Sequence, residues 1–152
     1  MLGDAQVDSL HDVINVYRCY HEPTPIPVGR PTSDQIRSLE AQLNVRFHPD
    51  YVTFLRSASD VVFGSLSPVT ATLPNAHTHI VSVCRRAWQD GGVPQTLIPI
   101  CHDNGDFYCV NPEGEVVYWS HQTHDLTDEK WHCIAQWIQC VLIDEELDQH
   151  VC

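Results

Sequence analysis

The spacing of hydrophobic residues changes twice along the chain, and this change limits the folds that it can adopt. Up to about residue 58 the apolar residues follow helical spacing, as in Ile36, Leu39 and Leu43. Between residues 61 and 119 short apolar runs alternate with turns, which is typical of strands. Helical spacing returns from about residue 128 to residue 148. This order predicts an α+β fold: a single domain with a largely antiparallel sheet of about five to six strands, flanked by helices.

Three helices are expected before the sheet. The first spans residues 4–20, and a proline-rich connector follows it to about residue 31. The second begins at Thr32 or Ser33, where Thr32 and Gln35 have the spacing of a capping box. Pro49 suits the first turn of the third helix. We therefore expect residues 1–31 to form a helix and connector that pack on a main domain of residues 32–152.

Strands are expected at five apolar runs, residues 61–63, 80–83, 97–100, 107–110 and 116–119. The segment 111–114 has Asn, Pro and Gly at the first, second and fourth positions of a type I turn, which indicates a hairpin between the last two strands. Asn104 and Gly105 indicate a second tight turn.

Acidic residues are concentrated in the last third of the chain. The whole chain has 20 Asp and Glu against eight Lys and Arg, a net charge of −12 with His neutral. Residues 100–152 hold eleven acidic residues and a single lysine, a net charge of −10. Such a chain repels phosphate groups, so direct binding to nucleic acid or to an anionic membrane is not expected. A cationic partner would be attracted and steered toward it.

The sequence favours a cytoplasmic protein without disulfides. The first twelve residues carry three Asp and no Lys or Arg, unlike a signal peptide, and no uncharged run is suited to a membrane span. The seven Cys are odd in number and none is in C-x-x-C spacing. They are best interpreted as small buried hydrophobic residues in a reducing compartment.

Catalytic motifs are missing, so the chain is not expected to be an enzyme or to hold a cofactor. It has no Gly-x-Ser-x-Gly elbow and no glycine-rich phosphate loop. Two histidine pairs, His77 with His79 and His121 with His124, have spacings that metal sites use. A metal-dependent hydrolase that uses these histidines therefore stays open as an alternative.

Two sequence blocks resemble the SUKH superfamily, which includes the SMI/KNR cell-wall regulators and many bacterial immunity proteins. The first block, residues 36–55, is similar to a helix bearing Leu-Glu followed by Leu-Pro-x-Asp-Tyr-x-x-Phe-Leu. The second, residues 98–121, is similar to the superfamily's Ile-Pro, Gly-Asp and Val-x-x-Trp-x-His core. The chain departs from the pattern where Phe47 and His48 replace the Leu before Pro49. It departs again where Ser59 and Asp60 replace Asn-Gly.

This resemblance implies an α+β fold, no catalytic apparatus and a bacterial protein that neutralises a cognate protein toxin by binding it. Such toxins are often nucleases or deaminases, and an acidic surface suits the basic cleft of a nuclease. A monomer or weak homodimer is expected. The fungal relatives leave a general scaffold or regulator open as a second alternative.

The expected partner-binding residues are acidic positions together with one tryptophan. Trp119 and Tyr118 end a strand next to His121, and they are either part of a binding groove or part of the core. The acids flank the tight turn, occupy the hairpin, precede or open the last helix, or crowd the end of that helix, where they oppose its dipole. The set is Asp103, Asp106, Glu113, Glu115, Trp119, Asp125, Asp128, Glu129, Asp144, Glu145 and Glu146.

Overall fold

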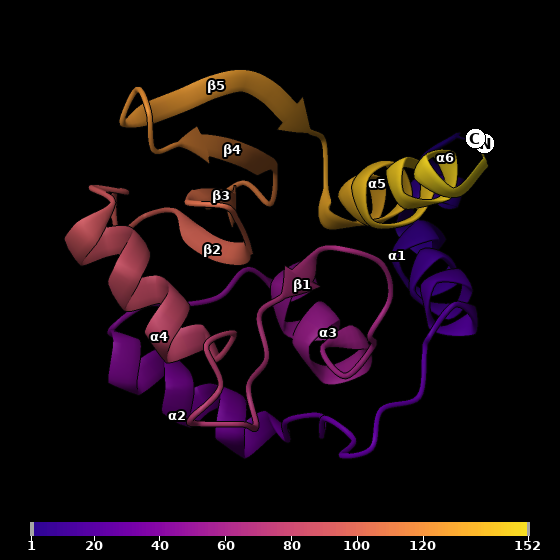
Figure 1. Ribbon diagram of the computed structural model, residues 1–152, viewed down its shortest axis with the longest axis horizontal. Coiled ribbons are helices and arrows are strands. Elements are labelled where there is room, and N and C mark those ends of the chain that lie inside the picture. Colours follow the sequence, from indigo (N-terminus) through magenta and orange to yellow (C-terminus); the bar gives the residue numbers. More distant parts are fainter. Residues whose placement is uncertain (1, 152) are drawn as a thin grey trace.

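Five antiparallel strands form one open sheet in the order β1-β2-β3-β4-β5 (Figure 1). The computed structural model describes the backbone of residues 2–151 and the side chains of residues 10–148. The strands are β1 Ser67–Pro68, β2 Ile98–Asp103, β3 Asp106–Val110, β4 Val116–Ser120 and β5 Asp125–Trp131. Each strand pairs with its neighbour in the chain, so the expected α+β fold with a largely antiparallel sheet is confirmed.

Three helices precede the sheet: α1 Leu2–Cys19, α2 Ser33–Leu43 and α3 Pro49–Ala58. The predicted capping box is present at the start of α2, where Thr32 accepts from the Gln35 backbone and the Gln35 side chain accepts from the Thr32 backbone. Pro49 lies in the first turn of α3 as expected. Tyr51 of α3 then donates a hydrogen bond of 2.9 Å to the Pro99 carbonyl, which holds α3 against β2.

The strand expected at residues 80–83 is wrong, because this segment is helix α4, Ile80–Arg85, continued by the π-helical turn η1, Arg86–Asp90. His79 caps the helix, since its ring accepts a hydrogen bond from the Val81 backbone. Ile80, Val83 and Cys84 are buried, and these positions, i, i+3 and i+4, lie on one face of a helix. Tertiary burial of that stripe overrides the preference of β-branched residues for strands.

Residues 61–63 do not form a strand either. Their backbone instead joins the segment that follows α1, because Glu22 N donates to the Val62 carbonyl at 2.8 Å. Val62 N in turn donates to the His21 ring.

The last helix begins later than its acidic residues suggest. Asp125, Asp128 and Glu129 lie on strand β5, and the helical segment starts only at Ile134. It comprises α5 Ile134–Trp137, the π-helical turn η2 Ile138–Asp144 and α6 Glu145–Val151. We expected these three acids to precede or open the helix. They lie instead on β5, which is an edge strand of the sheet.

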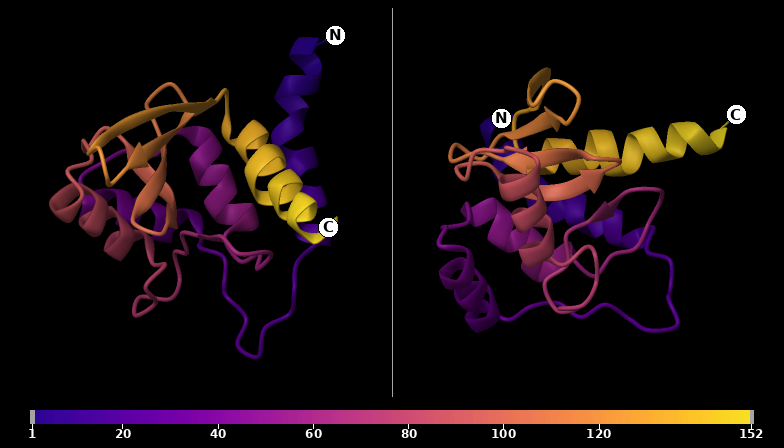
Figure 2. Two further views of the ribbon diagram at one scale, coloured as in Figure 1. Left: turned by 45° about the horizontal axis from the view of Figure 1, so that its top comes forward. Right: turned by 60° about the vertical axis from the view of Figure 1, so that its left-hand side comes forward.

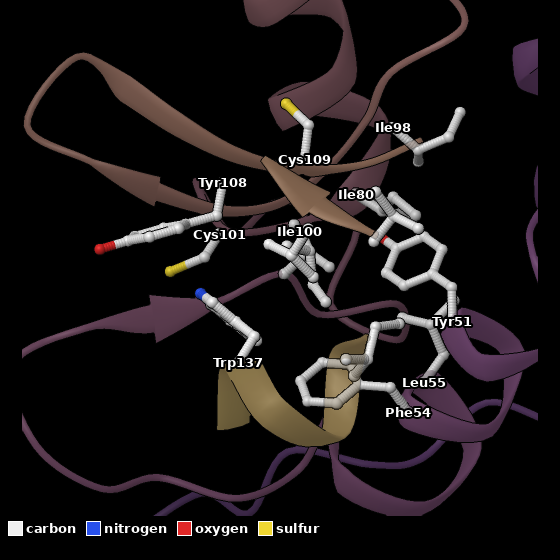
Figure 3. Packing of buried hydrophobic residues seen from close by; sticks show 14 of the residues in the cluster. Tyr51, Phe54, Leu55, Ile80, Ile98, Ile100, Cys101, Tyr108, Cys109 and Trp137 are labelled. Carbon is white, nitrogen blue, oxygen red and sulfur yellow. The ribbon is translucent and has the colours of Figure 1, made fainter. Parts of the chain in front are cut away.

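The two faces of the sheet pack against different parts of the chain. On one face Tyr108 contacts Trp137 of α5, with ring centroids 5.4 Å apart, and Figure 3 shows Trp137 directed toward Cys101 and Tyr108. On the other face the Trp119 indole donates to the carbonyl of Gly91, just after η1. Burial on both faces explains why the strands from β2 to β4 are nearly continuous in hydrophobic residues.

Helix α1 packs beside α3, α5 and η2. The connector between α1 and α2 extends as a loop away from the other elements (Figure 2). Arg18 of α1 forms a bidentate ion pair with Asp60, at 2.6 and 3.2 Å, which ties the helix to the end of α3. The division of the chain at residues 31 and 32 stays a prediction.

Candidate functional site

A single tyrosine hydroxyl joins the two aspartates that flank the tight turn between β2 and β3. Tyr118 OH lies 3.0 Å from Asp103 Oδ2 and 2.8 Å from Asp106 Oδ2. Burial, followed by the hydrogen bonds to both carboxylates, raises the pKa of Tyr118, so the phenol stays protonated. The hydroxyl thereby holds two negative charges close together at one end of the sheet.

The turn itself is a two-residue hairpin turn, as the sequence predicts. Asp103 pairs with Asp106, and Asn104 and Gly105 have φ of 51° and 95°. Positive φ at both central positions is the conformation that suits the twist of a hairpin and favours Asn-Gly. It fixes the spacing of the two aspartates through the backbone.

Asp106 also accepts hydrogen bonds from His121, at the end of β4. The His121 backbone N–H donates at 2.9 Å and the ring Nδ1 lies 2.5 Å from the same oxygen. Burial raises the pKa of Asp106, but these hydrogen bonds and the one from Tyr118 outweigh it and leave the pKa below its usual value. The Asp106 carboxylate is therefore ionised at neutral pH.

Two further carboxylates lie near Asp103, one from β5 and one from α6. Burial, then the negative charges of Glu129, Asp103 and Asp148, raises the pKa of Glu145. Burial and the charges of Asp103, Glu145 and Glu129 raise the pKa of Tyr108 in the same way. Glu129 and Asp103 therefore lie within electrostatic range of Glu145, and Tyr118 joins Asp103 to Asp106; we call Asp103, Asp106, Glu129 and Glu145 the acidic face.

Within the described residues, no lysine or arginine forms an ion pair with the acidic face. Lys130 pairs with Glu115 at 3.5 Å, and the arginines that form ion pairs do so with Asp34 and Asp60. The acidic face thus keeps charge that an external cationic group can neutralise.

The other predicted acids lie apart from this group or have local roles. Asp128 and Glu113 are exposed, on β5 and at the hairpin tip respectively. Glu115 accepts from Asn111 and pairs with Lys130. Asp125 accepts from the Leu126 backbone, and Asp144 accepts from Gln139.

Glu146 is buried, with 8% of its surface exposed, although it belongs to the acidic end of the chain. The Ser65 hydroxyl donates to its carboxylate at 3.1 Å. The side chain points into the fold toward Gly64 and Ser65, so little of it is accessible to a partner.

Trp119 is part of the core. Its side chain is 6% exposed, and its indole nitrogen donates to the Gly91 carbonyl at 3.2 Å. Of the two interpretations that the sequence allowed, the structure favours packing with a satisfied indole.

The sequence predicts Tyr118 as a groove or core residue beside Trp119 and assigns no role to Tyr108; the structure places the Tyr118 hydroxyl between Asp103 and Asp106 of the acidic face. Tyr108 and Tyr118 lie opposite one another on β3 and β4, with ring centroids 4.6 Å apart. The strand alternation around the hairpin at residues 111–114 gives this pairing, so the hairpin register was the signal that could have identified them.

The histidines of the two predicted pairs have separate local contacts within the described residues. His79 caps α4 and is 8% exposed, whereas His121 contacts Asp106. Across the described residues, no three His, Cys, Asp or Glu side chains are grouped so that they could hold a metal ion.

Three cysteines are buried and unsuited to nucleophilic chemistry. Burial raises the pKa of the Cys84 thiol to about 12, and it also raises the pKa of Cys101 and Cys109 well above the ordinary value. A thiol with a raised pKa holds little thiolate at neutral pH.

Comparison with known proteins identifies relatives of the chain. A SUKH family model described as SMI1-KNR4 cell-wall matches residues 10–143. A solved structure, described as a crystal structure of a protein from Pseudomonas syringae pv. tomato, is 43% identical in sequence. The similarity covers 86% of this chain and 96% of that chain, with a TM-score of 0.81. No curated protein matches the chain.

None of the helices that the structure describes is long and apolar enough to cross a membrane.

Proposed function

The chain belongs to the SMI1-KNR4 family of the SUKH superfamily, and from this premise we propose that it is an immunity-type protein that neutralises a cognate toxin by binding it. The proposal assigns binding to the acidic face and assigns no covalent chemistry to the chain. Its partner is a protein with a basic cleft, such as a nuclease toxin.

The observation that carries the proposal is the pair of carboxylates, Asp103 and Asp106, that the Tyr118 hydroxyl joins at the β2–β3 turn, with Glu145 within electrostatic range of Asp103 and of Glu129. A cleft that binds nucleic acid is cationic, because its substrate is anionic. A protein that presents fixed carboxylates can occupy such a cleft and associates quickly with it.

The rigidity of the acidic face suits this role. Asp103 and Asp106 are fixed by Tyr118 and by the turn, so little side-chain entropy is lost when they meet a cation. We assign no nucleophilic role to the buried Cys84 thiol, because its raised pKa leaves little thiolate at neutral pH.

Co-expression with the protein encoded by the neighbouring reading frame tests the proposal. We expect the chain to protect cells from that protein and to form a stable complex with it. The triple variant Asp103→Asn, Glu129→Gln and Glu145→Gln is expected to weaken the complex by at least tenfold at low salt.

A matched control removes the same charge elsewhere. Glu22, Asp90 and Glu113 are exposed, and no side-chain hydrogen bond or ion pair of theirs is found within the described residues. The variant Glu22→Gln, Asp90→Asn and Glu113→Gln should retain protection. Equal loss in both variants would show that only net charge matters, and recovery of several host proteins without a toxin would favour the scaffold alternative.

A further inference from the structure

A polar cavity of about 250 Å³ lies between α4, the loops around residues 65–67 and 77–78, and the β2–β3 turn. Its polar lining includes Arg86, His77, His102, Asp103, Asn104 and Ser67. We propose that this cavity binds a small zwitterion, of the class of free α-amino acids, with Arg86 on its carboxylate and Asp103 on its ammonium group. This site goes beyond the proposed toxin binding and shares only Asp103 with the acidic face.

The Arg86 guanidinium has N–H groups that none of its hydrogen bonds within the described structure uses. Its Nη2 donates to the His77 carbonyl at 2.6 Å, and its Nε reaches the Ser82 carbonyl at 3.5 Å. A guanidinium has five N–H donors, so Nη1 and one N–H of Nη2 are left. No carboxylate among the described residues forms an ion pair with Arg86. A ligand carboxylate is the acceptor that this planar group binds best.

Asp103 supplies the opposite charge on the same lining. Its Oδ2 accepts from Tyr118, and no donor to its Oδ1 is found among the described residues. An ionised carboxylate accepts at both oxygens, so Oδ1 can receive an ammonium N–H. Arg86 and Asp103 thus give one cavity a positive and a negative group, which suits a ligand that has both a carboxylate and an ammonium group.

His102 adds a neutral donor. The Gly105 backbone N–H donates to its Nε2 at 3.0 Å, so the ring proton of the neutral form is on Nδ1. Burial, followed by the positive charge of Arg86, lowers the pKa of His102. The ring therefore contributes hydrogen bonding and no second positive charge at neutral pH.

Size and charge restrict the ligand. The cavity volume of about 250 Å³ suits a small molecule. Drug-sized ligands need larger sites of about 300–1,000 Å³. A bare anion would be repelled by a chain of net charge −12, whereas a zwitterion has no net charge.

Titration of the purified protein with glycine, serine and threonine, followed by backbone amide NMR, tests the site. We expect saturable shifts at Gly105, Thr78 and Arg86. Acetate and methylammonium, each carrying one of the two charged groups, should bind at least tenfold more weakly. Saturation by acetate alone, or no saturable shift with any amino acid, would overturn the proposal.

A pair of neighbouring arginines provides the matched variants. Arg86→Gln is expected to weaken binding by about ten- to a hundredfold, the usual range for a hydrogen bond to a charged group. Arg85 is exposed and does not line the cavity, so Arg85→Gln should bind as the wild type does. Equal weakening by both variants would contradict the site. Toxin protection should survive Arg86→Gln, which separates this inference from the proposed function.

Discussion

The Glu146 side chain lies against Gly64 so closely that a Cβ atom added at Gly64 would come within 2.5 Å of the Glu146 carboxyl carbon. Gly64 also has a φ of 78°, where a residue with a Cβ is strained. The missing side chain at Gly64 therefore makes room for a buried carboxylate from the far end of the chain.

We predict that Gly64→Ala lowers the free energy of unfolding by about 2–3 kcal/mol. About 1 kcal/mol of this comes from the positive φ, and the rest from displacing Glu146 and its hydrogen bond with Ser65. Urea denaturation measures the change.

Gly92 is a matched control, because its φ is 72° and nothing lies within 4 Å of an added Cβ. Gly92→Ala should therefore cost only about 1 kcal/mol. In a Glu146→Ala background the extra cost of Gly64→Ala should disappear. If the double-mutant cycle shows the same cost of Gly64→Ala in both backgrounds, the contact between the two residues is unimportant for stability.

The capping box of α2 gives a second prediction. Thr32→Ala removes the hydroxyl that accepts from the Gln35 backbone, so the unfolding free energy should fall by about 1 kcal/mol. Thr123 is exposed, and its side chain has no hydrogen bond within the described part of the chain, so Thr123→Ala should be neutral. A neutral Thr32→Ala in urea denaturation would show that α2 is held by packing alone.

Local rules predicted these short-range features well. The capping box at Thr32, the position of Pro49 and the turn at Asn104 and Gly105 depend on residues within four positions of each other, and all are confirmed. Such motifs satisfy their hydrogen bonds locally, so the sequence contains the whole interaction.

Long-range features were predicted poorly for a physical reason. The segment at residues 80–83 is rich in β-branched residues, which favour strands. Its secondary structure nevertheless depends on which of its side chains the rest of the chain buries. The burial of Glu146 depends on Gly64, more than 80 residues earlier, and no local pattern contains that contact. The grouping of Glu129 with Glu145 likewise requires the turn from β5 into α5.

A third prediction concerns the hydroxyl that joins two carboxylates. Tyr118→Phe removes the hydrogen bonds to Asp103 and Asp106 and should lower the unfolding free energy by about 1 kcal/mol at pH 7. The figure is modest because the carboxylates are partly solvated. Tyr20→Phe is the control, since no hydrogen bond of the Tyr20 hydroxyl is found within the described structure and its ring stacks on Phe63.

The effect of Tyr118→Phe should depend on pH. The pKa of Asp106 is lower in the folded chain than in the unfolded one, so its contribution is present above about pH 4 and is lost as the pH falls through the folded pKa. The difference between Tyr118→Phe and wild type should therefore shrink in acid. A constant difference at every pH would mean that the hydroxyl stabilises the fold by something other than its hydrogen bonds to the ionised carboxylates.

The last prediction separates stability from binding at the acidic face. The pKa of Glu145 is raised in the folded chain, so its ionisation costs stability as the pH rises from the unfolded to the folded pKa. Glu145→Gln should therefore leave stability unchanged or increase it by a few tenths of a kcal/mol at pH 7 and low salt, because solvent screens this exposed carboxylate. The gain should vanish below about pH 4 and at high salt.

Urea denaturation at low and at high salt measures this change in the unfolding free energy, with Glu113→Gln as the control. A destabilised Glu145→Gln would show that the carboxylate supports the fold. A carboxylate that the fold does not need, next to others that repel it, is the arrangement expected of a surface that a cationic partner completes.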